Sequence, residues 1–206
     1  MTTENYPTGA DLLLAQLAAQ GVDTCFANPG TTELDVVRSM ETQDAVRCVI
    51  GLQENVCTGA ADGYGRMAGK PACTLLHLGP GYANGAANLH NARRAFTPVV
   101  NVIGDHATYH RGFDAPLNSD IAALAAPNSL WVKSAESADS VGPLAAEAIV
   151  ASYGTPGGNA CLILPADAAW NEATVDCTSC SIASPASAPS ASPRDRRDTR
   201  SGVTSV

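Results

Sequence analysis

The sequence predicts an α/β fold in which a parallel sheet carries helices on both faces. Short, nearly continuous apolar runs alternate along the chain with longer segments in which apolar residues recur at helical spacing. Such apolar strands are typical of a parallel sheet buried on both faces, and strand–helix alternation is typical of its connections. The 206 residues, 45% of them hydrophobic, suffice for one domain with a substantial core.

The apolar pattern, together with glycine and proline, gives the boundaries of the predicted elements. Predicted strands occupy residues 22–27, 46–52, 72–78, 98–104, 131–134 and 160–164. Predicted helices occupy residues 9–20, 31–40, 54–67, 83–95, 120–125 and 137–153. In the first helix, Leu12, Leu13 and Leu17 lie at helical spacing before Gly21 ends it. The last long helix repeats this spacing.

Turn and capping residues justify the elements in the middle of the chain. A turn at residues 28–30 is followed by an N-cap cluster, Thr31-Thr32-Glu33, that opens the second helix. The third helix, from Glu54, must stop by Gly69, because Pro71 cannot continue it. Each glycine inside this helix costs ~1 kcal/mol relative to alanine, so we expect one helix face to touch another backbone. We expect residues 79–81 to break the third strand.

Composition and charge exclude several classes of protein. The net charge of −8 argues against a nucleic-acid partner. No run of about 18 apolar residues predicts a membrane span. The first residues lack the basic and apolar regions of a secretory signal. The seven cysteines are scattered and suggest no disulfide framework, so we expect a cytoplasmic protein.

The last part of the chain differs from the rest. Residues 177–206 are rich in serine, proline and arginine and poor in apolar residues, which predicts a disordered tail. We therefore expect the folded domain to cover residues 1–170 and a dispensable tail to cover residues 171–206. Cys177 and Cys180 form a C-x-x-C pair in this tail, which we interpret as incidental because no second pair accompanies it.

Candidate site residues follow three of the predicted strands. These are the turn at residues 28–30, Glu54, and His77 with the glycines after it. Because the carboxyl ends of parallel strands lie along one edge of a sheet, we expect these residues to come together there. On their own, Glu54 could be a helix-start residue favoured by the helix dipole, and His77 could be a core histidine bonded to backbone.

Three segments carry a resemblance to a known family. NPGTTEL, GLQENVCTGAADGYGRMAGKP and LHLGPGYANG together resemble the N-terminal pyrimidine-binding domain of thiamine-diphosphate enzymes. The resemblance covers residues 8–167 and is strongest to acetolactate synthase large subunits and benzoylformate decarboxylase. It implies a flavodoxin-like three-layer domain, thiamine diphosphate as cofactor, and a small 2-oxo acid as substrate.

The resemblance also implies a role for each candidate residue. Glu54 would hydrogen-bond the pyrimidine nitrogen of the cofactor and promote the tautomer that deprotonates the thiazolium ring. This calls for a dry, apolar neighbourhood, which we expect Leu52, Val56 and Cys57 to provide. His77, in a segment similar to the decarboxylase N-L-H-S, would act as an acid or base. Thr31 would meet the substrate carboxylate or, as we favour, cap the helix. The cofactor-binding residues would be Pro29, Gly30, Glu54, Gly79, Pro80, Gly81 and Asn84.

The other half of the family's site is not found in the sequence. The diphosphate-binding domain holds Mg²⁺ through a G-D-G segment and an asparagine, and neither this pattern nor the central domain occurs here. We therefore assign no metal ligands to the chain. We expect a truncated copy, or one subunit of a split enzyme, that forms a homo- or hetero-oligomer with a diphosphate-binding domain. Alone, it should bind the cofactor poorly.

Four functions remain open on these grounds. The chain could belong to an acetolactate synthase-like enzyme that joins decarboxylation to carboligation, or to a decarboxylase of the benzoylformate type. It could also be a non-catalytic domain that binds or modulates a full-length relative. An unrelated flavodoxin-like binding module is disfavoured, because Glu54 occurs together with the Gly79-Pro80-Gly81 segment.

Overall fold

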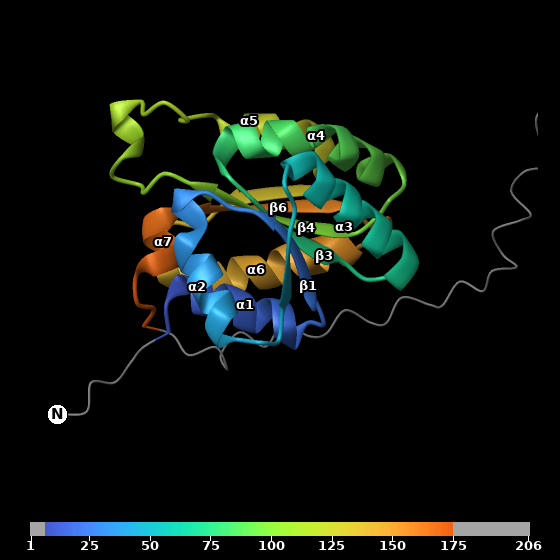
Figure 1. Ribbon diagram of the computed structural model, residues 1–206, viewed down its shortest axis with the longest axis horizontal. Helices are drawn as coiled ribbons and strands as arrows, with labels where there is room; N and C mark the ends of the chain where they lie inside the picture. Colours follow the sequence, from blue (N-terminus) through green and yellow to red (C-terminus); the bar gives the residue numbers. More distant parts are fainter. Residues whose placement is uncertain (1–6, 175–206) are drawn as a thin grey trace, which may run out of the picture.

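A computed structural model of the chain describes residues 7–174. Within this range, a six-stranded sheet has the strand order β2-β1-β3-β4-β6-β5. Every pair of neighbouring strands is parallel (Figure 1). The predicted α/β class and the parallel sheet are therefore confirmed.

The helices and strands follow the predicted order, with further short helices. The strands are β1 (Thr24–Asn28), β2 (Arg47–Ile50), β3 (Ala72–Leu76), β4 (Val99–Asp105), β5 (Trp131–Ser134) and β6 (Asn159–Pro165). The α-helices are α1 (Gly9–Ala19), α2 (Leu34–Thr42), α3 (Glu54–Ala68), α4 (Leu78–Arg94), α5 (Ile121–Ala125), α6 (Ala138–Tyr153) and α7 (Ala166–Trp170). Single 3₁₀ turns are η1 (Thr31–Glu33), η2 (Arg111–Phe113) and η3 (Ala126–Asn128).

Two apolar cores, one on each face of the sheet, make three layers. The first core joins the sheet to α1, α2, α6 and α7, and the second joins it to α3, α4 and α5 (Figure 1). β4 and β6 are buried along their whole length, which explains why their sequences are nearly continuous apolar runs.

Small residues let α3 approach both α4 and the segment that follows α4, as the glycines in α3 predicted. A Cβ atom at Gly65 would lie 2.6 Å from Thr97 Cγ2 and 2.9 Å from the Pro98 carbonyl oxygen. A Cβ atom at Gly85, on the facing helix, would lie 2.7 Å from Thr58 Cγ2. Gly63 is different, because nothing lies within 4 Å of its Cβ position. The packing therefore explains only part of the glycine content of α3.

The junction of β3 and α4 differs from the prediction. β3 ends at Leu76 and α4 begins at Leu78, so Gly79, Pro80 and Gly81 lie in the first turn of the helix. We expected a break there and a helix start near residue 83. Proline fits the first helical turn because the amide hydrogens of that turn have no intrahelical acceptor. The result is a helix that starts one residue after His77.

The folded contacts extend to the end of the described range. Thr8 forms an isolated antiparallel bridge with Glu172, and the Ala173 amide donates to the Pro7 carbonyl oxygen over 2.8 Å. Ala173 is buried, so the contacts run past residue 170, where we expected the domain to end. The expected tail from residue 177, including Cys177 and Cys180, lies outside the described residues. No helix in residues 7–174 is long and apolar enough to cross a membrane.

Two glycine substitutions in α3 test this packing. Gly65→Ala should lower the free energy of unfolding by ~1–3 kcal/mol, because the new methyl group would overlap Thr97 and the Pro98 backbone. Gly63→Ala, two residues away with open space around it, should raise the free energy by ~0.5–1 kcal/mol through helix propensity. Urea unfolding curves measure both values. Equal effects of the two substitutions would contradict the close approach at Gly65.

Candidate functional site

The candidate site lies where the direction of the chain connections reverses in the sheet. β1 lies between β2 and β3, so the chain leaves β1 toward β2 and leaves β3 toward β4. The helix after β1, α2, packs on one face, and the helix after β3, α4, packs on the other. Open α/β sheets bind ligands at the carboxyl ends of strands at such a reversal. Here these ends lead into Pro29 and His77.

A buried carboxylate joins the loops that follow β1 and β3. Glu33, 1% exposed, accepts hydrogen bonds from the Gly30 amide over 2.7 Å and from Thr32 Oγ1 over 2.5 Å. Its Oε2 atom lies 2.8 Å from His77 Nδ1. Because a carboxylate can only accept, Nδ1 carries the proton, and Nε2 is the ring nitrogen left to exchange a proton with a ligand.

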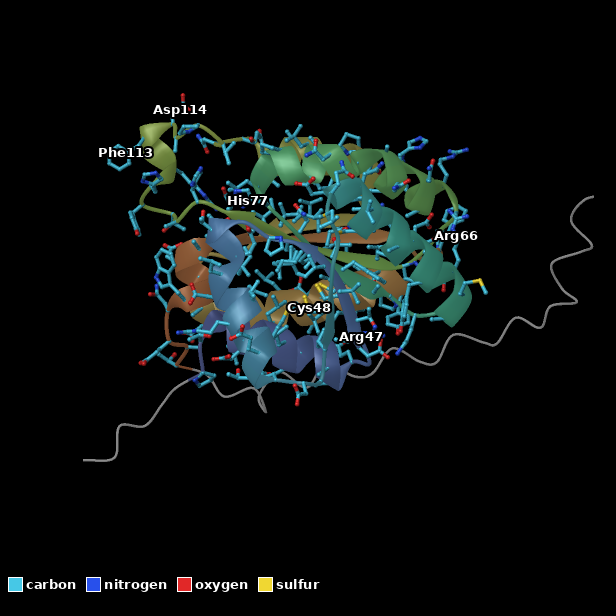
Figure 2. The ribbon with its side chains drawn as sticks, in the orientation of Figure 1. Arg47, Cys48, Arg66, His77, Phe113 and Asp114 are labelled. Atoms are coloured by element: carbon cyan, nitrogen blue, oxygen red, sulfur yellow. The ribbon has the colours of Figure 1, made fainter. Side chains whose placement is uncertain are left out.

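Glycines make room for this pair. A Cβ atom at Gly30 would lie 2.4 Å from His77 Cε1, and one at Gly104 would lie 1.6 Å from Glu33 Oε1. Leu78, directly after His77, is buried and has a φ of 57°, a left-handed conformation that costs a non-glycine residue energy. Backbone strain of this kind is typical of functional sites, where it fixes the direction of a neighbouring side chain. Here that neighbour is His77 (Figure 2).

Glu54 lies beside the same helix start. It begins α3, and its Oε2 atom accepts a hydrogen bond from Asn84 Nδ2 over 3.0 Å. A Cβ atom at Gly81 would lie 3.5 Å from both Glu54 Oε1 and His77 Cβ, so Gly81 lies between these two side chains. The structure thus brings four of the predicted site residues together: Glu54, His77, Gly81 and Asn84.

The expected dry neighbourhood of Glu54 is not present in the single chain. Leu52 is 95% exposed and Val56 is 59% exposed, so only Cys57 of the three expected apolar neighbours is buried. Burial raises the pKa of the Cys57 thiol, and the nearby Glu54 carboxylate raises it further. Leu52 points into solvent because β2 ends at Ile50, two residues earlier than predicted. The apolar side chains that flank Glu54 thus lie on an open surface.

The remaining predicted residues differ in exposure. Thr31 is exposed and does not cap the helix, contrary to our expectation, because Gly30 holds the N-cap position of η1. Pro29 is half-buried and Pro80 is exposed. Gly79 is buried, and its Cβ position lies 2.3 Å from Ser119 Oγ in the loop after β4.

Sequence reasoning missed the role of Glu33. We interpreted it as part of a helix-start cluster, and an acidic residue at that position suits any helix. Its burial follows from contacts with residues far along the chain, and the local pattern carries no sign of them. It also missed Asp105, which is 6% exposed at the end of β4 and pairs with Arg111 over 2.7 Å.

Comparison with known proteins identifies the family. The family model described as "Thiamine pyrophosphate enzyme, N-terminal TPP binding domain" matches residues 7–125. The chain belongs to this thiamine pyrophosphate enzyme family. Thiamine pyrophosphate is the same compound as thiamine diphosphate, so the resemblance in the sequence motifs is confirmed.

Individual family members show how much of a full-length enzyme the chain represents. It is 54% identical over 164 residues to "Putative acetolactate synthase large subunit IlvX" of Mycobacterium tuberculosis, covering 80% of this chain and 32% of that protein. It is 34% identical over 116 residues to benzoylformate decarboxylase of Pseudomonas aeruginosa, covering 56% and 22%. The solved 4-hydroxybenzoylformate decarboxylase of Rhodococcus jostii RHA1 superposes with a TM-score of 0.82 at 27% identity, covering 92% of this chain and 36% of that one. The chain therefore spans about a third or less of these relatives.

The residues present fit one half of the family's cofactor. A carboxylate oriented by Asn84, beside exposed apolar side chains, suits a flat heterocycle such as the pyrimidine ring. Within residues 7–174, no group of three or more His, Cys, Asp and Glu side chains is arranged to hold a metal ion. The described site thus offers contacts for the pyrimidine and no ligand cluster for a metal-bound diphosphate.

Replacing Glu33 tests the link between the two loops. Glu33→Gln should lower the free energy of unfolding by ~1–3 kcal/mol, because a neutral amide gives up charge-assisted hydrogen bonds in a buried position. Glu41→Gln, at an exposed position of α2, should change it by less than ~0.5 kcal/mol. Urea unfolding measures both variants. If Glu33→Gln is as stable as its control, the carboxylate does not hold this edge together.

Proposed function

We propose that this chain is the pyrimidine-binding part of an acetolactate synthase-like enzyme that acts on 2-oxo acids, coupling decarboxylation to carboligation. The grouping of Glu54, Asn84, Gly81 and His77 at the reversal point of the sheet carries this proposal. The identity to an acetolactate synthase large subunit-like protein supports the synthase reaction.

Glu54 would be the group that binds the pyrimidine. Thiamine diphosphate, when bound, supplies a carbon nucleophile for the 2-oxo acid and accepts the electrons released as carbon dioxide leaves. The proposed role of Glu54 is to hold a proton at the pyrimidine nitrogen. Asn84 donates to Oε2, which leaves Oε1 available to hydrogen-bond the pyrimidine nitrogen. Pro29, Gly30, Gly79 and Pro80 would form the backbone wall around it.

His77 and Thr31 are the candidates for the substrate side of the site. His77 is held through Nδ1 by Glu33, which leaves Nε2 to give or take a proton during addition and product release. Thr31 is exposed at the start of η1 and could donate its hydroxyl hydrogen to a substrate carboxylate. Both side chains lie on the loops that Glu33 joins.

A partner must complete the site under this proposal. Leu52 and Val56 are exposed beside Glu54, and a carboxyl group that exchanges a proton with the cofactor needs water excluded. We propose that a diphosphate-binding domain, with its Mg²⁺, covers these side chains in a homo- or hetero-oligomer. The diphosphate and metal contacts would then come from that partner.

A decarboxylase reaction of the benzoylformate type is the second candidate. It is favoured by His77 at the end of β3 and by the superposition on a 4-hydroxybenzoylformate decarboxylase. The two candidates differ in product. With pyruvate, the synthase releases acetolactate, whereas the decarboxylase releases an aldehyde, so product analysis on the completed enzyme separates them.

Replacing Glu54 tests its proposed role. In a complex of the chain with a diphosphate-binding domain, Glu54→Gln should slow hydrogen–deuterium exchange at C2 of the cofactor by ~10²–10⁴-fold, because an amide cannot relay the proton. Asp35→Asn removes a first-turn carboxylate from α2 and should leave exchange unchanged. NMR of the cofactor measures exchange, beside an unfolding curve for each variant. Unchanged exchange in Glu54→Gln would remove this residue from the mechanism, and no exchange with the wild-type chain would favour a non-catalytic role.

A further inference from the structure

A second asparagine of α4 bonds the first turn of α3, next to the residue that carries the candidate carboxylate. Asn88 lies one turn after Asn84 on α4, and both side chains reach α3. The Asn88 Nδ2 atom donates to the Asn55 carbonyl oxygen over 2.7 Å and to Asn55 Oδ1 over 2.6 Å. Because Asn55 directly follows Glu54, α4 bonds two successive residues of α3 through side chains four residues apart.

The partners of Asn88 fix the direction of its amide group. A backbone carbonyl oxygen can only accept, so the group of Asn88 that faces it is the NH₂ group, and the two Asn55 oxygens take both of its hydrogens. The Asn55 backbone amide is bonded too, because it donates to Gln53 Oε1 over 2.7 Å at the N-cap of α3. Asn55 is therefore held through its amide, its carbonyl and its side chain, which fixes the backbone from which Glu54 extends.

Two glycines make room for this contact between the helices. A Cβ atom at Gly59 would lie 2.8 Å from Asn88 Nδ2, so the amide can occupy its place only because residue 59 has no side chain. On α4, a Cβ atom at Gly85 would lie 3.6 Å from the Glu54 carbonyl oxygen. The fully buried Thr58 donates to the Gly85 carbonyl oxygen over 3.0 Å. The backbones thus come close enough for a short asparagine side chain to join them.

The hydrogen bond between Glu54 and Asn84 needs such support. Asn84 is exposed and Glu54 is half-buried, so water competes for the groups that form this bond. Asn88 and Asn55 are both half-buried, one turn further into the contact between the helices. A displacement of a reacting group by about 1 Å can slow an enzyme by ~10²-fold, even when the mutation lies away from the chemistry.

We infer that Asn88 is a positioning residue for Glu54. It holds the first turn of α3 against α4, so that the Glu54 carboxylate meets Asn84 through Oε2 and keeps Oε1 for a ligand. The positioning of the carboxylate rests on these contacts, whereas its effect on catalysis rests on the proposed function.

NMR of the full chain, without cofactor or partner, tests the positioning. Asn88→Leu keeps a branched side chain of similar size but has no donor for the Asn55 oxygens. The signal of the Asn84 side-chain amide should then move from its wild-type position toward its position in Glu54→Ala, a reference that lacks the acceptor. Because no cofactor is present, this result does not depend on whether Glu54 has its proposed role.

A pair of glycine substitutions separates positioning from general stability. Gly59→Ala retains Asn88 but displaces its amide group, and should shift the Asn84 signal in the same direction as Asn88→Leu. Gly63→Ala, one turn further along α3, meets nothing within 4 Å and should leave the signal at its wild-type position. Both substitutions raise helix propensity, so a difference between them reports the Asn88 contact. Thermal unfolding checks the fold of each variant.

Cofactor chemistry gives the second measurement. In a complex of the chain with a diphosphate-binding domain, Asn88→Leu and Gly59→Ala should slow hydrogen–deuterium exchange at C2 of the cofactor at least about 10-fold. Gly63→Ala should exchange as wild type. A role in folding alone predicts a lower unfolding temperature with an unchanged exchange rate in the folded complex. Absence of exchange with the wild-type chain would count against the proposed function, and the Asn84 signal of the free chain would still decide the role of Asn88.

Three results would overturn the inference. The first is an Asn84 signal at its wild-type position in folded Asn88→Leu or, if that variant does not fold, in Gly59→Ala. The second is an equal shift of this signal in Gly59→Ala and Gly63→Ala, which would show a general response to changes in α3. The third is exchange at the wild-type rate in both the Asn88→Leu and Gly59→Ala complexes, when the wild-type complex itself is active.

Discussion

The buried carboxylate of Glu33 is the contact on which the arrangement of the site depends. It accepts hydrogen bonds from the loop after β1 and bonds the imidazole of His77, which follows β3. It also occupies the position that a side chain at Gly104 in β4 would fill. Three strand ends are thereby fixed relative to one another by one side chain. His77 is presented at this edge with a defined free nitrogen, and the strained Leu78 passes the chain directly into α4. That helix in turn places Gly81 and Asn84 beside Glu54.

At this edge, polar side chains are held by hydrogen bonds within the chain, while apolar side chains beside them are exposed. Hydrogen bonds within the chain orient His77 and Glu54, whereas Leu52 and Val56 remain exposed where the cofactor would lie. An exposed apolar surface next to a polar site is typical of a site formed between two domains. Under the proposed function, this domain supplies one half of the site, and the chain spans about a third of the family members it matches.

Much of the fold could be predicted because its signals are local. Apolar runs give the strands, helical spacing gives the helices, and the order of the two gives the parallel sheet. The start of α4 could not be placed, since Gly79-Pro80-Gly81 suits a break as well as a first helical turn.

At the site, the motifs indicated Glu54 and His77. Glu33, Asp105 and Arg111 were missed because their importance comes from burial and from partners distant in sequence. The exposure of Leu52 was also unpredictable, because it depends on where β2 stops.

Calorimetric titration of thiamine diphosphate with Mg²⁺ tests the half-site most directly. The cofactor would be titrated into this chain, into a diphosphate-binding domain of a family member, and into their mixture. The account predicts weak binding to the chain alone and binding to the mixture at least about 100-fold tighter than to either part, because the pyrimidine and diphosphate contacts then act on one ligand. Tight, Mg²⁺-dependent binding to the chain alone, or a mixture that binds no tighter than the diphosphate-binding domain, would contradict it.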